Sequence, residues 1–373
     1  MFLQACVHCC IDKPHRQRRN INAMLKPLPP RTTHLLGRSP PAFWCAPAYV
    51  VTARHTHMAY RDLGPPNGEP WLVLHGGPGS GAQPGLVQAF ALDRQRVVVP
   101  DQRGSGLSHP RGRTAGNHTD QLVADLERLR QQLGIKQWSL LAGSWGTVLA
   151  LNYAQKHPQR VARVVLRGAF KLRWAEIGGL LQMRSSGPRG LAQLEHLLQV
   201  GTHPVATLHA IRWWNLLELN AVLHGMWRSL IHATASPDQA STVAIRRDWV
   251  QIKRQQRKAT ARFKRPGISH ADRRGWQKFR IQSHYLRHLG FQKPGDLDRA
   301  VRDLASHGIP SDWVHGRFDA VCPTSNSQNW LAKTQALNTS LARGHWPIGG
   351  HLATEPGLRS VLEKVIHDRP LRP

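Results

Sequence analysis

Short apolar runs alternate with longer segments of mixed polarity along most of the chain. The runs are three to five residues long, as is typical of strands buried on both faces. Strands separated by helical segments form βαβ units, so this rhythm predicts a mostly parallel sheet flanked by helices. The first two runs predict an opening hairpin. In chain order the expected strands are 49–52, 58–61, 72–74, 97–99, 138–141, 164–166 and 311–315.

Helical periodicity appears between these runs. In the segment 116–133, apolar residues recur at Leu122, Leu126, Leu129 and Leu133, which places them on one helix face. The segments 147–154 and 355–367 also have helix-like patterns. With the strands, these segments predict an α/β core over residues 48–170 and 291–373.

Residues 171–290 interrupt the strand rhythm. This region holds six tryptophans among helix-forming stretches, and it carries no strand-like alternation. We therefore expect a helical cap inserted into the core. The total of 373 residues suits a core of about 200 residues plus such an insertion.

A serine stands where an apolar run meets a helical one. Ser144 follows the run 138–142 and precedes the segment 147–154, with Gly143 and Gly146 on either side. A tight turn between a strand and a helix exposes such a serine as a nucleophile. The usual Gly-x-Ser-x-Gly pattern has Ala142 at its first position here, and alanine is small enough for the turn.

A glycine-rich loop, His75-Gly-Gly-Pro-Gly-Ser-Gly81, follows the run 71–74. Glycines let backbone N–H groups point into a cavity, where they can stabilise an oxyanion. We expect the loop to act together with the N–H group of Trp145, the residue that follows the serine. A plain turn after a strand is the competing interpretation. A phosphate cradle is a poorer interpretation, because the Gly-Lys-Ser/Thr ending and the Gly-x-Gly-x-x-Gly spacing are missing.

An acid and a base are expected downstream, in the order Ser, Asp, His. Asp319 lies in a turn after the strand 311–315, and His351 follows two glycines 32 residues later. In this arrangement His351 would accept the serine proton, and Asp319 would orient the imidazole. Asp312 and His345 are the rival acid and base, and both are less favoured by turn context.

These motifs resemble those of the proline iminopeptidases, a branch of the α/β-hydrolase fold. The resemblance covers roughly residues 48–370 and implies an α/β-hydrolase core, a helical cap and the triad Ser144, Asp319 and His351. It also implies that Gly77, or Gly76, donates to the oxyanion together with Trp145, and that Arg167 lies near the substrate. The matching segments are His75–Gly79, Asp101–Ser108, Leu122–Arg130, Gly143–Gly146, Leu149–Pro158, Val165–Gly168, Gly316–Pro323, Gly350–His351 and Glu355–Gly357.

The resemblance fails where the family binds the substrate's ammonium group with two cap carboxylates. One carboxylate follows a Trp-x-x-Trp motif, and the nearest match, Asp248–Lys253, puts Lys253 there. The other lies in an Arg-Ile-Glu-x-His-Tyr motif, which here has Gln282 in place of the acid and keeps Tyr285. A lysine repels an ammonium. We therefore expect intact hydrolytic chemistry with weakened or altered aminopeptidase specificity.

The formal net charge of +29 is concentrated in two regions. Residues 241–280 hold 13 Lys and Arg against two Asp, and residues 1–55 hold eight against one. We interpret the first region as a solvated basic face of the cap, or one that steers anionic substrates. We do not expect nucleic-acid binding, because no nucleic-acid fold motif accompanies the charge.

Residues 1–47 are rich in Pro, Arg, Asn and Thr and lack periodicity, so we expect a disordered basic extension. A transit peptide, or a true start at Met24, are alternatives. Five cysteines form no disulfide framework and suit a cytoplasmic protein. Cys6, Cys9, Cys10 and His8 lack a second ligand pair, so we expect no metal and no cofactor. No apolar stretch is long enough to span a membrane.

The sequence thus predicts a serine hydrolase that resembles prolyl aminopeptidase and acts on a small peptide, amide or ester. An esterase or amidase with another acyl preference is the alternative within this class. A non-catalytic binding protein on the same scaffold is the other class, but every triad residue is present. The sequence does not indicate an oligomeric state.

Overall fold

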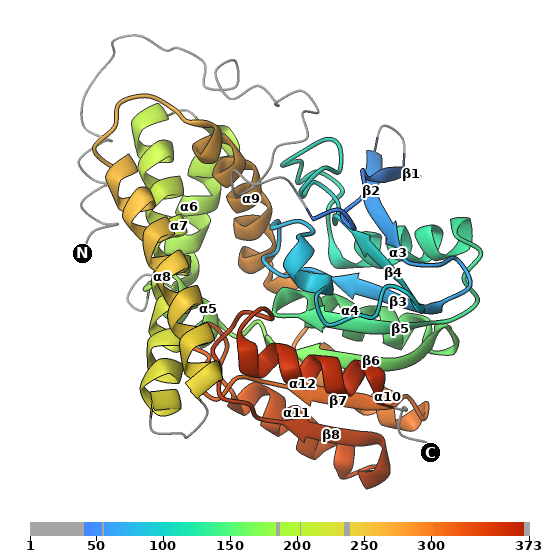
Figure 1. The fold of residues 1–373 in the computed structure, drawn as a ribbon. Coiled ribbons are helices and arrows are strands. Elements are labelled where there is room, and N and C mark those ends of the chain that lie inside the picture. The colour runs from blue at the N-terminus through green and yellow to red at the C-terminus, as the bar shows by residue number, and fades with distance from the viewer. Residues whose placement is uncertain (1–40, 54–55, 184–186, 202, 235–238, 369–373) are drawn as a thin grey trace.

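A single eight-stranded sheet forms the centre of the computed structural model, which describes residues 41–53, 56–183, 187–201, 203–234 and 239–368 (Figure 1). The strand order is β1-β2-β4-β3-β5-β6-β7-β8. Strands β1 and β2 form an antiparallel hairpin and β2 pairs antiparallel with β4, whereas all other pairs are parallel. The strands are β1 (Ala48–Ala53), β2 (Thr56–Leu63), β3 (Glu69–Leu74), β4 (Gln95–Pro100), β5 (Trp138–Gly143), β6 (Val161–Arg167), β7 (Ser311–Val314) and β8 (Ala342–His345).

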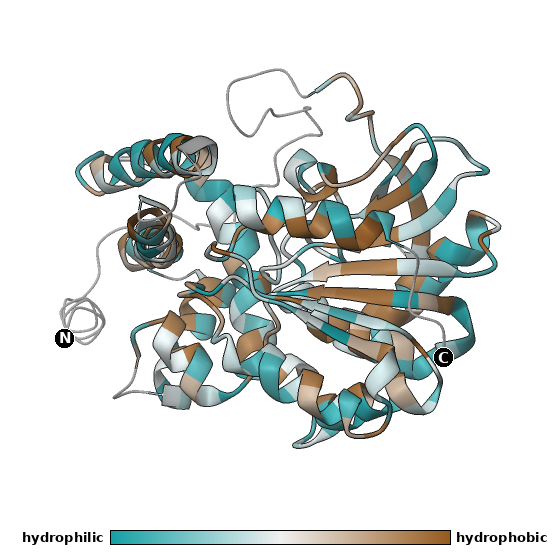
Figure 2. Ribbon diagram, turned by 60° about the horizontal axis from the view of Figure 1, so that its bottom comes forward, coloured by the Kyte–Doolittle hydropathy of each residue, from teal (hydrophilic) through white to brown (hydrophobic). Residues whose placement is uncertain are grey.

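The central strands are buried because each face of the sheet packs against helices. In β3, Leu72 and Leu74 point into one apolar cluster, and Trp71 and Val73 point into another. This alternation is the period of two expected of a strand. The apolar strands lie between helix layers in Figure 2, which explains why their sequences are continuous apolar runs rather than alternating ones.

The two faces carry different helices. Helices α3 (Thr119–Gln132), α4 (Trp145–Lys156), α10 (Asp296–Ser306) and α11 (Ser325–Gln335) contribute apolar side chains to the cluster that contains Leu72. Helix α12 (Pro356–His367) covers the opposite face. Single 3-10 turns are η1 (Pro84–Val87), η2 (Pro158–Arg160), η3 (Leu289–Phe291) and η4 (Thr339–Leu341).

Of the six α-helices described between β6 and β7 in the chain, the first five stand beside the sheet rather than on its faces, and only α10 packs on the sheet (Figure 1). Helix α8 packs along α7, and α9 packs against both α6 and α7. We call these five helices the cap. They are α5 (Trp174–Leu180), α6 (Gly187–Val200), α7 (Pro204–Thr234), α8 (Gln239–Arg262) and α9 (His270–Arg287).

The cap contacts the loops that follow the strands. A Cβ atom on Gly225 of α7 would lie 2.6 Å from the carbonyl oxygen of Phe318. A Cβ atom on Gly79 would lie 2.6 Å from the carbonyl oxygen of Lys278 on α9. These close approaches need residues without side chains. They seat α7 and α9 directly on the carboxyl end of the sheet.

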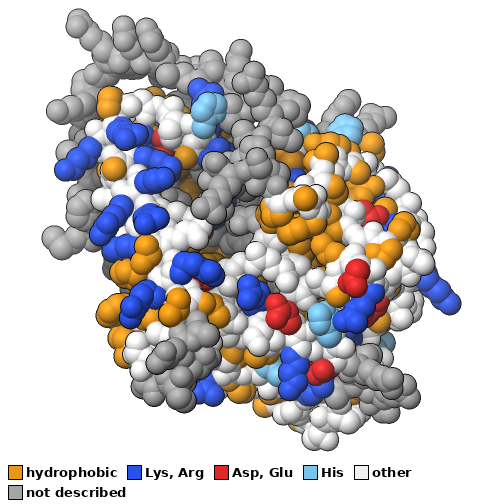
Figure 3. All heavy atoms as spheres, in the orientation of Figure 1, with side chains coloured by type: hydrophobic (Ala, Val, Ile, Leu, Met, Phe, Trp, Pro, Cys, Tyr) orange, Lys and Arg blue, Asp and Glu red, His pale blue; other side chains and the backbone are white. Residues whose placement is uncertain are grey.

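Basic residues gather on α8 and the turn that follows it, where blue side chains line the edge of the molecule in Figure 3. Among the described residues, no helix combines the length and apolar character that crossing a bilayer would require. The exposed cations of this face are Arg246, Arg247, Arg254, Arg257, Lys258, Lys264 and Arg265.

The expected fold class, an α/β-hydrolase with a mostly parallel sheet, is confirmed. The sequence pattern missed β8, and His351 lies in the loop beyond this strand. The expectations for residues 1–40, including the cysteine group and Met24, lie outside the described residues. Residues 41–47 form no helix or strand, but the Arg61 guanidinium stacks on Trp44 and donates to the carbonyl of Cys45.

Candidate active site

Ser144 lies at the turn between β5 and α4. Its backbone has φ 56° and ψ −126°, a conformation that L-residues other than glycine rarely adopt. The turn is held because the Ser144 N–H donates to the carbonyl of Arg167 on β6 (2.9 Å), and the Thr147 hydroxyl donates to the Ser144 carbonyl (2.7 Å). Strain at such a position is typical of a functional residue.

The Ser144 hydroxyl faces the glycine-rich loop and the loop after β7. A Cβ atom on Gly76 would lie 3.6 Å from Ser144 Oγ, so the loop passes directly beside the serine. On the other side, Ser144 Oγ lies 3.9 Å from the Sγ atom of Cys322. The serine is half-buried, which leaves its oxygen accessible to a small reactant.

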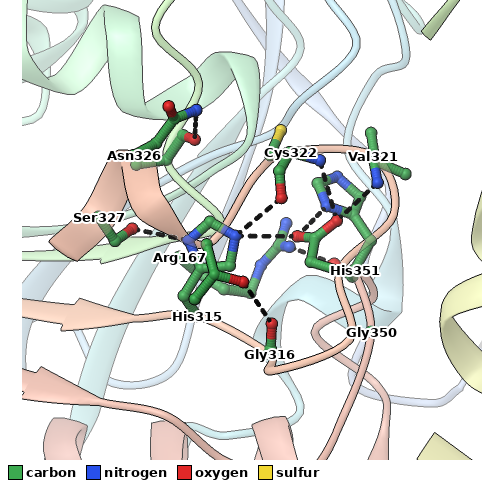
Figure 4. A network of polar contacts seen from close by, with 12 residues as sticks. Arg167, His315, Gly316, Val321, Cys322, Asn326, Ser327, Gly350 and His351 are labelled. Carbon is green, nitrogen blue, oxygen red and sulfur yellow. Dashed lines mark hydrogen bonds and ion pairs between the residues drawn. The ribbon is translucent and has the colours of Figure 1, made fainter. Parts of the chain in front are cut away.

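Asp319 and His351 meet beside this serine. Nδ1 of His351 donates to Oδ2 of Asp319 at 2.7 Å, and Oδ1 of Asp319 accepts from the N–H groups of Val321 and Cys322 (Figure 4). A Cβ atom on Gly168 would lie 3.3 Å from Asp319 Oδ2 and 3.4 Å from His351 Cε1. The pair therefore packs on the residue after β6, next to Arg167, whose carbonyl holds Ser144.

A second histidine lies behind the acid. His315 is fully buried, and its Nε2 lies 3.3 Å from Asp319 Oδ2, while its Nδ1 contacts the Ser327 hydroxyl at 2.7 Å. Burial opposes ionisation of Asp319. The charge of His351 and the hydrogen bonds from His315 and His351 outweigh it and hold the pKa of Asp319 well below its usual range. The carboxylate is thus an anion on which His351 is oriented.

The hydroxyl and the imidazole are not hydrogen-bonded to each other among the described residues. Ser144 Oγ lies 3.9 Å from the Sγ atom of Cys322 instead. Catalytic hydrogen bonds are often long in the absence of substrate. Burial raises the pKa of the Cys322 thiol well above its usual value, so this neighbour stays protonated.

The glycine-rich loop is braced from beneath by residues of the Asp101–Gly104 segment. The buried ring of His75 accepts from the Gln102 N–H at 3.1 Å, and the Gln102 amide donates to the His75 carbonyl at 2.8 Å. Asp101 accepts from the Ala82 and Leu107 N–H groups. The sequence pattern singled out these residues only as a motif, and their role as loop supports depends on tertiary contacts.

The expected oxyanion donors lie around this loop. Trp145 begins α4, where backbone N–H groups are free of intrahelical partners, and its indole donates to Gln102 at 2.9 Å. Gly77 and Gly76 lie in the braced loop beside Ser144. Their assignment as donors stays a prediction.

The rival acid and base pair with each other instead. His345 Nε2 lies 2.9 Å from Asp312 Oδ1, and Arg343 also contacts this carboxylate. Both residues belong to strands of the sheet rather than to the loops beyond it.

The four expected substrate-binding residues lie in different surroundings. The buried Arg167 donates to the His351 carbonyl, behind the imidazole. The Tyr285 hydroxyl donates to Asn117 at 2.6 Å, and its ring packs on Trp145. Gln282 is buried, and its Oε1 has no hydrogen-bond partner among the described residues. Lys253 lies on α8, where its amine makes no ion pair within the described part of the chain.

A carboxylate that the sequence analysis did not select is connected to the glycine-rich loop through α9. Glu218 on α7 forms an ion pair with Lys278 on α9, and both side chains are about one quarter exposed. The Lys278 backbone contacts Gly79, and Gln282 follows one helical turn later. Trp214, four residues before Glu218, is the signal that could have revealed it.

Glu355 supports the loop that carries His351. Its carboxylate accepts from the Gly350 N–H at 2.7 Å and from the Leu352 N–H at 2.9 Å. Burial raises the pKa of Glu355 to about 7, although the two N–H donors act in the opposite direction.

This raised pKa predicts a pH dependence of stability. The folded state binds the Glu355 proton more tightly than the unfolded state, so stability is lost as pH rises from about 4.5 through about 7. We expect the wild-type melting temperature to fall by roughly 2–5 °C between about pH 4.5 and about 7 because of Glu355. In Glu355→Gln this contribution to the fall should be missing. Melting curves of both proteins at several pH values measure the difference. Glu363→Gln, a half-exposed glutamate on the same helix, should leave the slope unchanged, and an equal slope for Glu355→Gln would contradict the prediction.

Comparisons of the sequence with family models and with curated proteins agree with each other. The model of the alpha/beta hydrolase fold matches residues 70–195. The chain is 33% identical to a proline iminopeptidase of Xylella fastidiosa over 80% of its own length and 88% of the relative's. It is 30% identical to the proline iminopeptidase of Neisseria gonorrhoeae, covering 86% and 94%.

Solved structures share the fold at low sequence identity. An α/β-hydrolase from a Medee basin deep-sea metagenome library superposes with a TM-score of 0.56 at 15% identity, covering 86% of this chain and 96% of that one. A 2-hydroxy-6-oxo-6-phenylhexa-2,4-dienoate hydrolase from Rhodococcus gives a TM-score of 0.54 at 16% identity, covering 86% of this chain and 96% of that one. At such low identity these likenesses support the fold alone.

Proposed function

Since the chain belongs to the proline iminopeptidase family of α/β-hydrolases, and is therefore a hydrolase, we propose that it cleaves an acyl bond through Ser144, His351 and Asp319. The observation that carries this proposal is the convergence of three loops. Ser144 stands strained beside the glycine-rich loop, and the His351–Asp319 pair lies at the ends of the neighbouring strands. The substrate proposed is a small peptide with a free N-terminal residue, proline by family membership.

The proposed mechanism has two half-reactions. The Ser144 oxygen attacks the substrate carbonyl carbon while His351 Nε2 takes the hydroxyl proton. The N–H groups of Trp145 and Gly77, or Gly76, stabilise the oxyanion. The C–N bond then breaks as His351 returns the proton to the leaving amine, which leaves an acyl-enzyme. Water, deprotonated by His351, attacks the ester, and collapse of the second intermediate releases the acid and restores the serine.

The cap carboxylates decide how strongly a free amine is held. Read with the family's Trp-x-x-Trp-Glu motif, Trp214-Asn-Leu-Leu-Glu218 matches better than the segment that ends at Lys253, with Leu217 in place of the second tryptophan. This match favours Glu218 as the retained carboxylate. Gln282 still replaces the second one. The ammonium of Lys278 already neutralises Glu218, so we propose that this enzyme binds amines less tightly than a site with two free carboxylates would.

A substrate panel tests the proposed function. Purified protein is assayed with prolyl, alanyl and N-acetyl-prolyl arylamides and with short-chain aryl esters, side by side. The proposal expects hydrolysis of the prolyl arylamide with only a modest preference over its N-acetyl form. Ester hydrolysis without any arylamide turnover would favour the esterase alternative, and no turnover at all would contradict both.

Removing the internal cation is expected to strengthen amine recognition. Lys278→Gln leaves Glu218 free to pair with the substrate ammonium, so the ratio of kcat/KM for prolyl over N-acetyl-prolyl arylamide should rise about three- to tenfold. Lys253→Gln is the matched control, because its amine contacts no described carboxylate, and it should leave the ratio unchanged. A rise in the control alone would instead support the Lys253 assignment.

A further inference from the structure

Three metal-ligating side chains converge where α6 meets α9, away from the glycine-rich loop. Glu195 comes from α6, His284 lies in the last turn of α9, and His288, four residues later, is the C-cap of α9. One ligand atom from each residue lies within 4.8 Å of the others. Histidines at i and i+4 on one helix face are a common way to present two imidazoles to one ion.

In each of the two imidazoles, one ring nitrogen donates a hydrogen bond to a backbone carbonyl, and the other keeps a lone pair. His284 Nε2 lies 3.0 Å from the Asn117 carbonyl oxygen, which can only accept, so this nitrogen carries the proton. His288 Nδ1 likewise donates to the His284 carbonyl at 2.8 Å. In the neutral rings, His284 Nδ1 and His288 Nε2 are left with lone pairs. An N–H bound to a backbone carbonyl is how metal-ligating histidines are usually oriented.

The third ligand is a buried carboxylate whose two oxygens have different partners. Glu195 is 5% exposed, and its Oε2 accepts from Arg287 at 2.7 Å. Its Oε1 lies 3.3 Å from His284 Nδ1. Two lone pairs facing each other at this distance repel unless a proton or a cation lies between them. Arg287 thus pairs with Oε2, the carboxylate oxygen that does not contact His284.

We propose that Glu195, His284 and His288 form a binding site for a divalent transition-metal ion such as Zn²⁺. Two imidazoles and one carboxylate suit zinc, which prefers tetrahedral nitrogen and oxygen ligands at about 2.0–2.2 Å. Ligand atoms in that geometry lie about 3.3 Å apart, so the ligand atoms, now within 4.8 Å of one another, would have to move closer when the ion binds. The site is independent of the proposed hydrolysis and differs from the expectation that the chain holds no metal.

The ion would stabilise the cap at the place where α9 contacts the core. It would join α6 to α9, and His284 is bonded to Asn117 in the loop before α3. The adjacent Tyr285 donates to Asn117 and packs on Trp145, the residue after Ser144. Zinc is therefore expected to raise the melting temperature, because it binds only when these elements are assembled.

The test is a calorimetric zinc titration of tag-free protein carrying Cys6→Ser, Cys9→Ser and Cys10→Ser, which removes the N-terminal thiols as competing ligands. His288→Ala is added as the test variant, and its melting temperature without metal reports whether it is folded. His196→Ala, an exposed histidine beside Glu195 on α6, is the matched control. Melting temperatures with and without Zn²⁺ are recorded for all three proteins.

The expected result is one saturable site that binds at least about tenfold more weakly in His288→Ala and is unchanged in His196→Ala. The zinc-dependent rise in melting temperature should be lost in the same variant. Equal binding in all three proteins, or no saturable site in any, would overturn the proposal. If no saturable site is found, a proton on His284 Nδ1, donated to Glu195, accounts for their close contact instead.

Discussion

Ser144→Ala is expected to lower kcat by about 10⁴-fold or more, the largest effect of any single change in this chain. The variant removes the only atom that becomes bonded to the substrate, so neither the imidazole nor the oxyanion donors can replace it. The substrate should still bind, and KM should change little. Turnover of a reactive arylamide or ester measures the loss, and labelling by a fluorophosphonate should disappear with it.

The thiol of Cys322 is an alternative nucleophile, so the Ser144→Ala result needs a control at Cys322. Cys322 Sγ lies 3.9 Å from the serine oxygen, and a thiol is the other nucleophile that could attack an acyl group here. Its raised pKa keeps it protonated, so Cys322→Ala should retain labelling and most of the activity. Ser360→Ala, an exposed serine on α12, controls for the substitution itself. Labelling that survives Ser144→Ala but not Cys322→Ala would reverse the assignment.

Asp319→Asn is expected to lower kcat by about 10⁴-fold while the fold is retained. Oδ1 of Asp319 must accept from the Val321 and Cys322 N–H groups, so the new amide nitrogen would face His351 Nδ1. An N–H there forces the ring proton onto Nε2, and His351 can then no longer accept the Ser144 proton. The loss should fall on kcat far more than on KM.

Two readouts separate this role from a structural one. Nitrogen chemical shifts of His351 should report the changed tautomer, and the melting temperature should show whether the variant is folded. Asp312→Asn is the matched control because Asp312 is an equally buried carboxylate that pairs with His345. It should cost stability but less than about tenfold in kcat. If Asp312→Asn were the inactive variant and Asp319→Asn the active one, the proposed acid would be wrong.

The cap explains why amine recognition and hydrolysis can be changed separately in this chain. The carbonyl of Lys278 and the side chain of Ile281 rest on Gly79 in the glycine-rich loop, while the charge of Lys278 is directed to Glu218. The proposed reacting groups lie on loops of the sheet, and the charges proposed to act on a substrate amine lie on α7 and α9. Substitutions at the Glu218–Lys278 pair should therefore change specificity without altering the triad.

Much of the fold could be predicted from local patterns. The apolar runs that form the centres of β3, β4, β5 and β6 are apolar because helices cover both faces of those strands. Side chains on both faces are therefore buried, and the sequence shows a continuous apolar run. Strand β8 was missed because only Ala342 is buried among its four residues, so its sequence carries no apolar run. A short strand at the edge of a sheet is defined by its neighbour's hydrogen bonds rather than by its own composition.

The sequence by itself determined the fold class, the serine turn and the order of the candidate triad, because each depends on residues adjacent in the chain. Only the tertiary structure decided that His315 supports Asp319, that Cys322 faces Ser144 and that Lys278 neutralises Glu218. These pairs join separate loops or helices, and Lys278 lies 60 residues from its partner. Contacts of this kind depend on how α7 and α9 pack against the sheet, and no local periodicity records that packing.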